Sequence, residues 1–233
     1  MKGFDILVKF FKIIFCVTCF LSFTLTAYAS PMNDLLFNSI VNNNLEMLKV
    51  AIDNGAQLNS KDYRYSPLSV AVKRHKLEVA SYLISSGAQL DKGPYGSNEN
   101  KKSNLMLAVD NDDYLMAKLL IDSGENVNAV DAMGNTALSF YFYHYGPRAN
   151  IVQLLVDAHI DVNKPNCYGM TPIMLFAKST KMLGAEIECL EILIKAGANP
   201  ALKDNNGKTA LAHAIALNNI DAINILLPIS PKN

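Results

Sequence analysis

Residues 190–200 read LEILIKAGANP, residues 203–208 read KDNNGK, and residues 209–216 read TALAHAIA. The first segment has apolar residues at helical spacing and ends at a glycine, which can adopt the left-handed backbone conformation that closes a helix. The second segment is polar and typical of a turn, and in the third a threonine opens a helix rich in small residues. The three segments therefore predict one supersecondary unit of helix, turn and helix.

This unit recurs along the chain. Its helix-ending residue returns at spacings of 32, 37, 35 and 38, at Gly55, Gly87, Gly124, His159 and Gly197. Its helix-opening residue returns at spacings of 32, 37, 33, 35 and 38, at Asp34, Ser66, Ser103, Thr136, Thr171 and Thr209. Because the two markers drift together, they indicate six structural repeats rather than one chance match.

Repeats of this length with a turn and two helices resemble the ankyrin repeat, most sharply in GMTPI at residues 169–173 and GKTAL at residues 207–211. The resemblance implies an all-α repeat solenoid, in which six helix-turn-helix units with short hairpin-like turns form a curved stack. It also implies a concave surface of inner helices and turn tips that binds proteins. We place the units within one domain, residues 30–233, at about 34–62, 63–102, 103–132, 133–167, 168–205 and 206–228.

The first 29 residues differ in composition from the rest. Three lysines precede an apolar run at residues 13–23, and Ala27-Tyr28-Ala29 follows. This order predicts a secretory signal peptide cleaved after Ala29. A retained membrane anchor is the alternative, but the run is short for the ~20 residues that a bilayer needs. We therefore expect a periplasmic or secreted protein without membrane insertion after cleavage.

Charge and cysteine usage exclude several classes of function. The chain has 21 basic and 21 acidic residues, and loss of residues 1–29 leaves 18 and 20, a net charge of −2. Such a balance favours no nucleic-acid partner. Cys167 and Cys189 are expected at a turn tip and in the core, too far apart for a disulfide within the ~7 Å limit between Cα atoms. Two cysteines cannot build a tetrahedral metal site, and we expect no metal and no cofactor.

Nothing in the sequence indicates an enzyme. The four histidines are scattered, no Ser or Cys lies in a nucleophile motif, and no Gly-rich loop follows a strand. The acidic cluster Asp110, Asp112 and Asp113 falls at the predicted bend of the third unit. We interpret it as a solvated turn, with a metal or acid/base site as the alternative.

The fourth unit departs most from the repeat. Residues 140–145 read FYFYHY, and Tyr141 and Phe142 stand where the ankyrin family usually has two alanines. Because a helix turns 100° per residue, the rings cannot all be buried, and we expect at least Tyr143 or Tyr145 to face solvent or a partner. The alternative is that the rings fill space created by about two inserted residues before Ile151.

The turn tips complete the predicted binding surface. The turn at residues 92–102 is longer than the others and is either a contact loop anchored by Tyr95 or a flexible surface loop. Tyrosines are enriched in binding hot spots, where the ring fills a pocket and the hydroxyl keeps a hydrogen bond. The candidate partner-binding residues are Tyr63, Arg64, Tyr65, Tyr95, Tyr141, Tyr143, His144, Tyr145 and Tyr168.

One feature of the resemblance is missing from the turns. In the ankyrin family a histidine usually follows the Thr-Pro-Leu position and ties adjacent turns by hydrogen bonds. At that position this chain has Phe37, Ser69, Met106, Ser139, Met174 and Ala212. The turns therefore lack this histidine tie.

The resulting hypothesis is a non-catalytic protein-interaction module that is a monomer when unbound. By analogy with exported bacterial ankyrin-like proteins, it would be an immunity or inhibitor protein for a co-exported toxin or hydrolase. The alternatives are a secreted factor that binds a host-cell protein, a helper of an envelope enzyme, or a purely structural spacer. The identity of the partner cannot be read from a repeat scaffold.

Overall fold

The computed structural model describes residues 31–59, 65–90, 102–144, 148–178 and 185–230, with only the backbone described at residues 143–144 and 185–186. The predicted signal peptide therefore lies outside the described residues. Residues 32–233 form one compact unit. No helix among the described residues is long and apolar enough to cross a membrane.

The described residues are all-helical, as the repeat pattern predicts. Twelve α-helices form six consecutive pairs, and a 3₁₀ turn, η1 (Leu227–Ile229), follows the last. The first helices of the pairs are α2 (Pro31–Val41), α4 (Pro67–Lys73), α6 (Asn104–Asp110), α8 (Ala137–His144), α10 (Pro172–Ala177) and α12 (Ala210–Ala216). The second helices are α3 (Leu45–Asp53), α5 (Leu77–Ser85), α7 (Tyr114–Asp122), α9 (Ala149–Asp157), α11 (Ala185–Lys195) and α13 (Ile220–Leu226).

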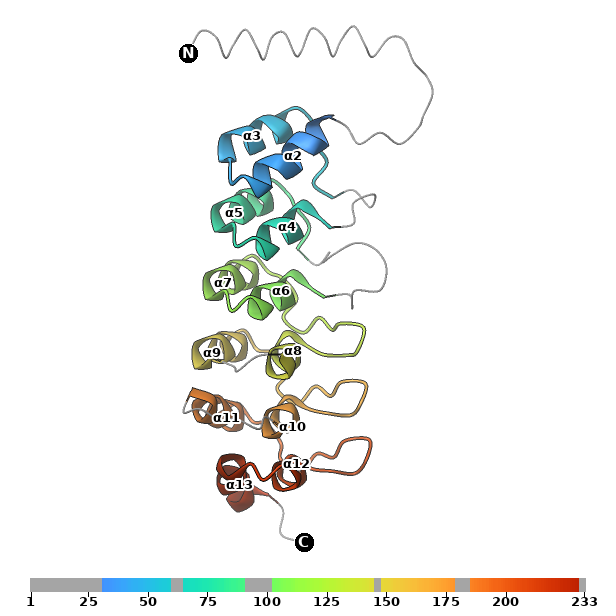
Figure 1. The fold of residues 1–233 in the computed structure, drawn as a ribbon, viewed down its shortest axis with the longest axis vertical. Coiled ribbons are helices and arrows are strands. Elements are labelled where there is room, and N and C mark those ends of the chain that lie inside the picture. Colours follow the sequence, from blue (N-terminus) through green and yellow to red (C-terminus); the bar gives the residue numbers. More distant parts are fainter. Residues whose placement is uncertain (1–30, 60–64, 91–101, 145–147, 179–184, 231–233) are drawn as a thin grey trace, which may run out of the picture. The chain divides into compact units, whose positions relative to one another are not determined.

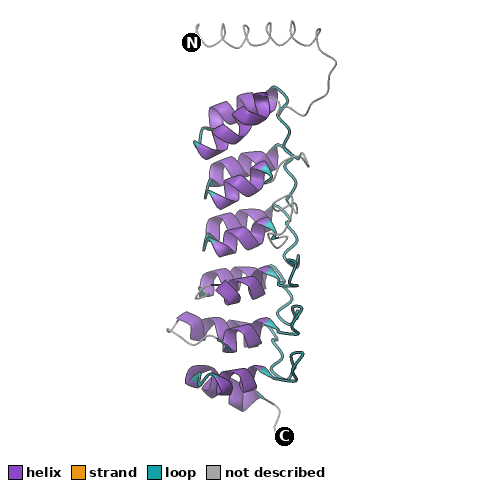
Figure 2. Ribbon diagram, turned by 45° about the vertical axis from the view of Figure 1, so that its right-hand side comes forward, coloured by secondary structure: helices purple, strands orange, loops and turns teal. Residues whose placement is uncertain are grey.

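The helices lie in two layers. From α4 to α12 each first helix contacts the next first helix, and from α3 to α13 each second helix contacts the next second helix. The described turns at residues 131–135, 166–170 and 204–208 project on the side of the first helices (Figures 1 and 2). The first helices and turns therefore form one side of the stack, and the second helices form the other.

The core repeats with the units. Two residues after five of the six predicted helix-opening positions, an apolar side chain is fully buried, at Leu36, Leu68, Leu105, Leu138 and Ile173, whereas Leu211 is only partly buried. In the second helices the same holds for Ala51, Leu83, Leu120, Leu155, Leu193 and Leu226. Burial of these two rows between layers makes the core continuous from one pair to the next.

Most of the predicted helix starts and bends are confirmed. Ser66, Ser103 and Thr209 precede their helices and accept hydrogen bonds from backbone N–H groups of the first turn. The prediction for Asp34 is wrong: α2 begins at Pro31, so this carboxylate lies in its first turn, where the helix dipole still favours a negative charge. His75 and His159 have positive φ angles of 55° and 61°, as expected for bend residues.

Asparagine side chains fasten neighbouring units. Asn163 donates to the carbonyl oxygen of Gly197 at 2.9 Å and accepts from the Asn199 N–H at 2.8 Å. Asn59 and Asn128, four residues after a helix-ending position, make the same pair of bonds to the unit that follows. These bonds hold successive units together where their second helices end.

The last pair exposes apolar side chains. Ile215 is 58% exposed, although the equivalent residues of the four preceding pairs are buried, namely Val72, Val109, Phe142 and Ala177. Exposed apolar residues near it in sequence are Leu217, Ile220, Leu227 and Ile229.

Candidate protein-interaction surface

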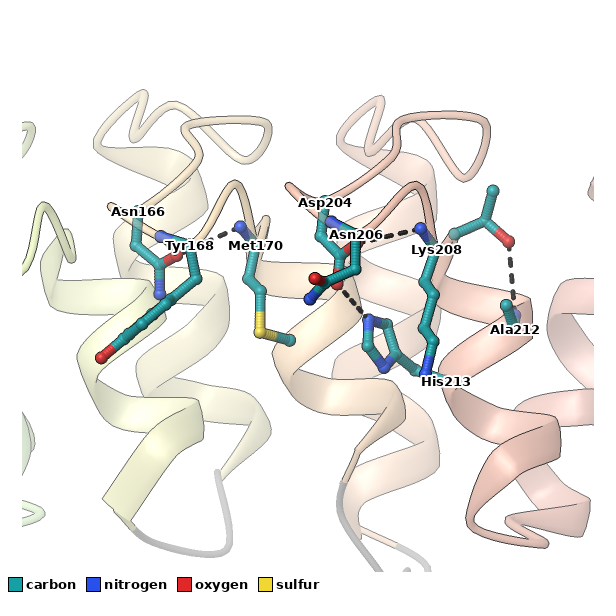
Figure 3. A network of polar contacts seen from close by, with 9 residues as sticks. Asn166, Tyr168, Met170, Asp204, Asn206, Lys208, Ala212 and His213 are labelled. Carbon is teal, nitrogen blue, oxygen red and sulfur yellow. Dashed lines mark hydrogen bonds and ion pairs between the residues drawn. The ribbon is translucent and has the colours of Figure 1, made fainter.

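Each described turn is built around one Asp or Asn side chain. Asp204 Oδ1 accepts hydrogen bonds from the Asn206 and Lys208 N–H groups, both at 2.9 Å. Asn166 Oδ1 accepts from Tyr168 and Met170 at 3.0 and 3.1 Å (Figure 3). In the preceding turn the same role belongs to Asp131, which accepts from Met133 and Asn135. One acceptor thus fixes the course of four following residues in each turn.

Adjacent turns are also bonded to one another. The Cys167 N–H donates to the Met133 carbonyl at 2.8 Å, and the Asn205 N–H donates to the Tyr168 carbonyl at 3.1 Å. A side-chain bond from Asn166 Nδ2 to Asn135 Oδ1 at 3.0 Å adds a second link. The turns at 131–135, 166–170 and 204–208 therefore form a connected ribbon without the histidine tie.

The sequence contains a signal for these ties that the spacing of helix openings and endings alone does not reveal. Asp131, Asn166 and Asp204 each lie five residues before the threonine that opens the next helix. An acid or amide at this constant distance predicts an Asx-type turn, in which a short side chain accepts backbone N–H groups.

The last turn has a further bond to its helix. His213 Nε2 lies 2.8 Å from Asp204 Oδ2, and both side chains are almost fully buried. Burial disfavours the charged form of Asp204, but the hydrogen bonds from Lys208, His213 and Asn206 outweigh it and lower the pKa of the carboxyl. In the sequence His213 is one of four scattered histidines, whereas in the structure it anchors a turn.

Two contacts define an exposed strip along the first helices. Lys73 Nζ lies 5.2 Å from the centre of the Tyr65 ring, and Lys102 Nζ lies 3.3 Å from Asp110 Oδ2. In both units one partner directly precedes the helix-opening residue, and the other lies seven residues after the helix-opening residue. The two positions are therefore neighbours on one face of a first helix. We define the first-helix strip as the members of these two positions from α4 onward whose described side chains lie outside the core: Tyr65, Lys73, Lys102, Asp110, Lys178, Lys208 and Ala216.

The predicted partner-binding residues fall into three groups. Tyr65 is half-buried within the first-helix strip, and Tyr168 is 55% exposed on its turn. Figure 3 shows Tyr168 and Lys208 running from their turns along the first helices. The predictions outside the described residues are Tyr63, Arg64, Tyr95 and Tyr145. The backbones of Tyr143 and His144 end α8, and Tyr143 has the same position seven residues after the helix opening as Lys73.

The prediction that Tyr141 contacts a partner is wrong. This side chain is among the largest fully buried ones. Its hydroxyl donates to Asp112 Oδ1 at 2.8 Å and accepts from the Arg148 N–H at 3.0 Å, and Arg148 Nε lies 2.6 Å from Asp112 Oδ2. Burial first, and Asp112 in addition, raise the pKa of the hydroxyl well above its ordinary value, although the Arg148 N–H opposes this. Tyr141 therefore fastens the bend of the third unit to the start of α9.

The rings beside Tyr141 are core residues too. Phe140 and Phe142 are buried, and the Phe142 ring packs edge-on against Phe176 with 5.4 Å between centroids. The rings of residues 140–142 are therefore part of the core.

The carboxylates of the acidic cluster in the third unit bind neighbouring residues of the fold. Asp110 pairs with Lys102, Asp112 holds Tyr141 and Arg148, and Asp113 lies 3.0 Å from His75 Nδ1. Asp113 also caps α7 by accepting from the Met116 N–H. Among the described residues no three His, Cys, Asp or Glu side chains are grouped to hold a metal ion. Cys167 is exposed and Cys189 buried, and no disulfide joins them.

Comparison with known proteins identifies the repeat. A family model described as ankyrin repeats (3 copies) matches residues 105–204 and 141–233. The chain belongs to the ankyrin repeat family. Ankyrin repeats are protein-protein interaction modules, and their fold is generally a non-catalytic scaffold.

Similar proteins share the repeats rather than one activity. The chain is 30% identical over 162 residues to an intracellular phospholipase A2 of Caenorhabditis elegans, covering 70% of this chain and 14% of that protein. It is 30% identical over 164 residues to an ankyrin repeat protein of Fowlpox virus (strain NVSL), covering 70% and 37%. Because the chain spans so little of these relatives, the likeness to the phospholipase extends only to its repeats.

Solved ankyrin domains have the same fold. An ankyrin repeat domain of Acinetobacter baumannii matches with a TM-score of 0.71 at 23% identity, over 84% of this chain and 98% of that one. The ankyrin repeat domain of Bcl-3 matches with a TM-score of 0.70 at 20% identity, over 83% and 85%. At these identities the likeness concerns the fold alone.

Proposed function

We propose that this ankyrin repeat chain binds a partner protein across the first-helix strip and the turn ribbon of residues 131–135, 166–170 and 204–208. The observation that carries the proposal is Tyr168, whose exposed ring stands on a turn fixed by Asn166 and bonded to both neighbouring turns. A large ring held on a rigid backbone loses little conformational freedom on binding.

We place this binding in the periplasm or outside the cell on the basis of the first 29 residues. Their lysines, apolar run and Ala-Tyr-Ala sequence support cleavage after Ala29 and action in the periplasm or outside the cell. In such a compartment, a non-catalytic monomer with a rigid binding surface suits an immunity or inhibitor protein that blocks a co-exported toxin or hydrolase.

The experiment is capture of the partner by tagged residues 30–233 from envelope and culture-supernatant fractions of the source cells, followed by mass spectrometry. We expect one stoichiometric protein. Tyr168→Ala should reduce the captured amount at least tenfold, as for a binding hot spot.

The matched control is Leu115→Ala, since Leu115 is 61% exposed on α7 in the layer of second helices. This variant should capture as much partner as the natural protein. Loss of the partner with Leu115→Ala and its retention with Tyr168→Ala would place the binding surface on the other side and contradict the proposal.

A further inference from the structure

The near-zero net charge of the chain hides a separation of charge between its two layers. The described side chains of the second helices include eight carboxylates: Glu46, Asp53, Glu78, Asp122, Asp157, Glu188, Glu191 and Asp221. The same helices carry three lysines, each in an ion pair within its own helix: Lys49 with Glu46, Lys118 with Asp122, and Lys195 with Glu191. This layer is therefore acidic.

On the side of the first helices and turns, exposed cations outnumber exposed acids. The exposed cations of the first helices, their ends and the connecting turns are Lys73, Arg74, Lys164, Lys178, Lys203 and Lys208, and Lys102 is half-buried. The exposed acids there are Asp34 and Asp161, while Asp110 is half-buried and paired with Lys102. Glu125, Asp131 and Asp204 are buried, and the half-buried Asp112 and Asp113 hold Tyr141, Arg148 and His75. Because Asp131 and Asp204 are directed into their own turns, they present little negative charge to a partner.

Three cations of the first-helix strip are exposed and accessible to a partner protein. Lys73, Lys178 and Lys208 lie on the first-helix strip and are exposed, and the structure shows no ion pair between any of them and a described carboxylate. Lys208 runs beside α12 on the same side of the helices as Tyr168 (Figure 3). The strip thus combines exposed cations with a tyrosine, while a carboxylate-rich layer lies behind it.

We infer that the first-helix strip takes an acidic segment of the partner protein. This inference rests on the proposed function and adds the chemistry of the partner. Exposed charges of this kind raise the rate of association and orient the encounter more than they tighten the final complex. The acidic second-helix layer would repel the same segment, so a partner would approach the stack from one side.

A protein fits this surface better than a nucleic acid. The described cations of the strip are separated by neutral and paired positions, and the whole chain has a pI near 6.9. Nucleic-acid-binding domains instead present a dense basic face and commonly a pI above about 9.

The test uses residues 30–233 and a fluorescein-labelled random copolymer of glutamate and tyrosine. The strip variant carries Lys73→Gln, Lys178→Gln and Lys208→Gln. The matched control carries Lys49→Gln, Lys118→Gln and Lys195→Gln, which removes three positive charges from the second helices. Both variants have the same net charge, and equal melting temperatures would show that neither has lost its fold.

We expect the strip variant to bind the copolymer roughly tenfold more weakly than the natural protein, and the control less than twofold, with affinity falling as salt rises. Equal losses in the two variants, tighter binding of a lysine–tyrosine copolymer, or tighter binding of oligo-dT would overturn the inference. A partner captured with no dependence on salt or on the strip lysines would also overturn it, yet would leave the proposed function standing.

Discussion

Helix α8 and the turn at residues 166–170 both carry tyrosines that the sequence marks as candidates for a binding surface. Tyr141 of α8 is fully buried and holds Asp112 and Arg148, whereas Tyr168 of the turn is 55% exposed. The two residues differ in register. Tyr141 stands five residues after a helix opening, at a buried position, and Tyr168 stands three residues before a helix opening. Position within the repeat therefore decides which aromatic ring is exposed, and residue type alone does not.

The largest expected effect is on the stability of variants of the buried Tyr141. Tyr141→Ala removes a fully buried ring and should lower the free energy of unfolding by about 3–5 kcal/mol. Urea denaturation followed by circular dichroism would measure it. Tyr141→Phe keeps the ring but leaves Asp112 and the Arg148 N–H without the hydroxyl, and should cost about 1–2 kcal/mol. A loss below ~0.5 kcal/mol for Tyr141→Ala would mean that this ring is exposed in solution.

A second pair of variants tests the rigidity of the turn that carries Tyr168. Gly169 and Gly207 have the same positive φ of 74°, but a Cβ at Gly169 would lie 2.5 Å from Asn205 Oδ1 and 2.7 Å from the Asn205 nitrogen. A Cβ at Gly207 would meet nothing within 4 Å.

Gly207→Ala should therefore lower the free energy of unfolding by about 1–2 kcal/mol, because alanine disfavours the left-handed conformation. Gly169→Ala should lower it by about 2–4 kcal/mol, because its Cβ would also displace the next turn. The same denaturation series measures both. Equal costs would show that the turns at 166–170 and 204–208 do not touch as closely as described.

Asp204 allows a test by pH. Its pKa is lowered in the folded protein, so its ionised form stabilises the fold above about pH 4, the ordinary range of an Asp, and this contribution is lost as the pH falls through the lowered pKa. Asp204→Asn keeps an acceptor for the turn, as Asn166 does naturally, but loses the charged bond to His213.

We expect Asp204→Asn to be less stable at pH 7 by about 1–2 kcal/mol and to lose less stability than the natural protein between pH 5 and about pH 3. Thermal unfolding across this pH series is the measurement. Parallel curves of stability against pH for the two proteins would show that the Asp204 carboxylate does not stabilise the last turn through its charge.

The smallest effect belongs to the exposed tyrosine. Tyr168→Ala should change the free energy of unfolding by less than about 0.5 kcal/mol, because the turn is held by Asn166 and the backbone rather than by the ring. Denaturation at neutral pH would show this. A larger loss would mean that Tyr168 packs into the fold, which would make its role in binding hard to separate from stability.

Much of the fold can be predicted from the sequence, because helix openings and endings recur at nearly constant spacing. The period, the layers and the bend residues His75 and His159 follow from local chemistry alone. The register also contains the Asx turns of Asp131, Asn166 and Asp204, although their role is visible only once the N–H groups they accept are known.

The candidate site is less predictable for a physical reason. Tyr141 is buried because Asp112 and Arg148, which are 29 residues before it and seven after it, offer its hydroxyl partners inside the stack. Such partners satisfy a buried polar group and remove the argument that a tyrosine must reach the surface. Helical geometry limits how many rings α8 can bury, but the neighbouring units decide which ones.

Hydrogen–deuterium exchange of residues 30–233, free and bound to the captured partner, would show which side of the stack binds. We expect the partner to slow exchange in the turns at 166–170 and 204–208 and at the ends of the first helices, with little change in α5, α7 and α9. Protection confined to those second helices, with the turns unchanged, would contradict this expectation.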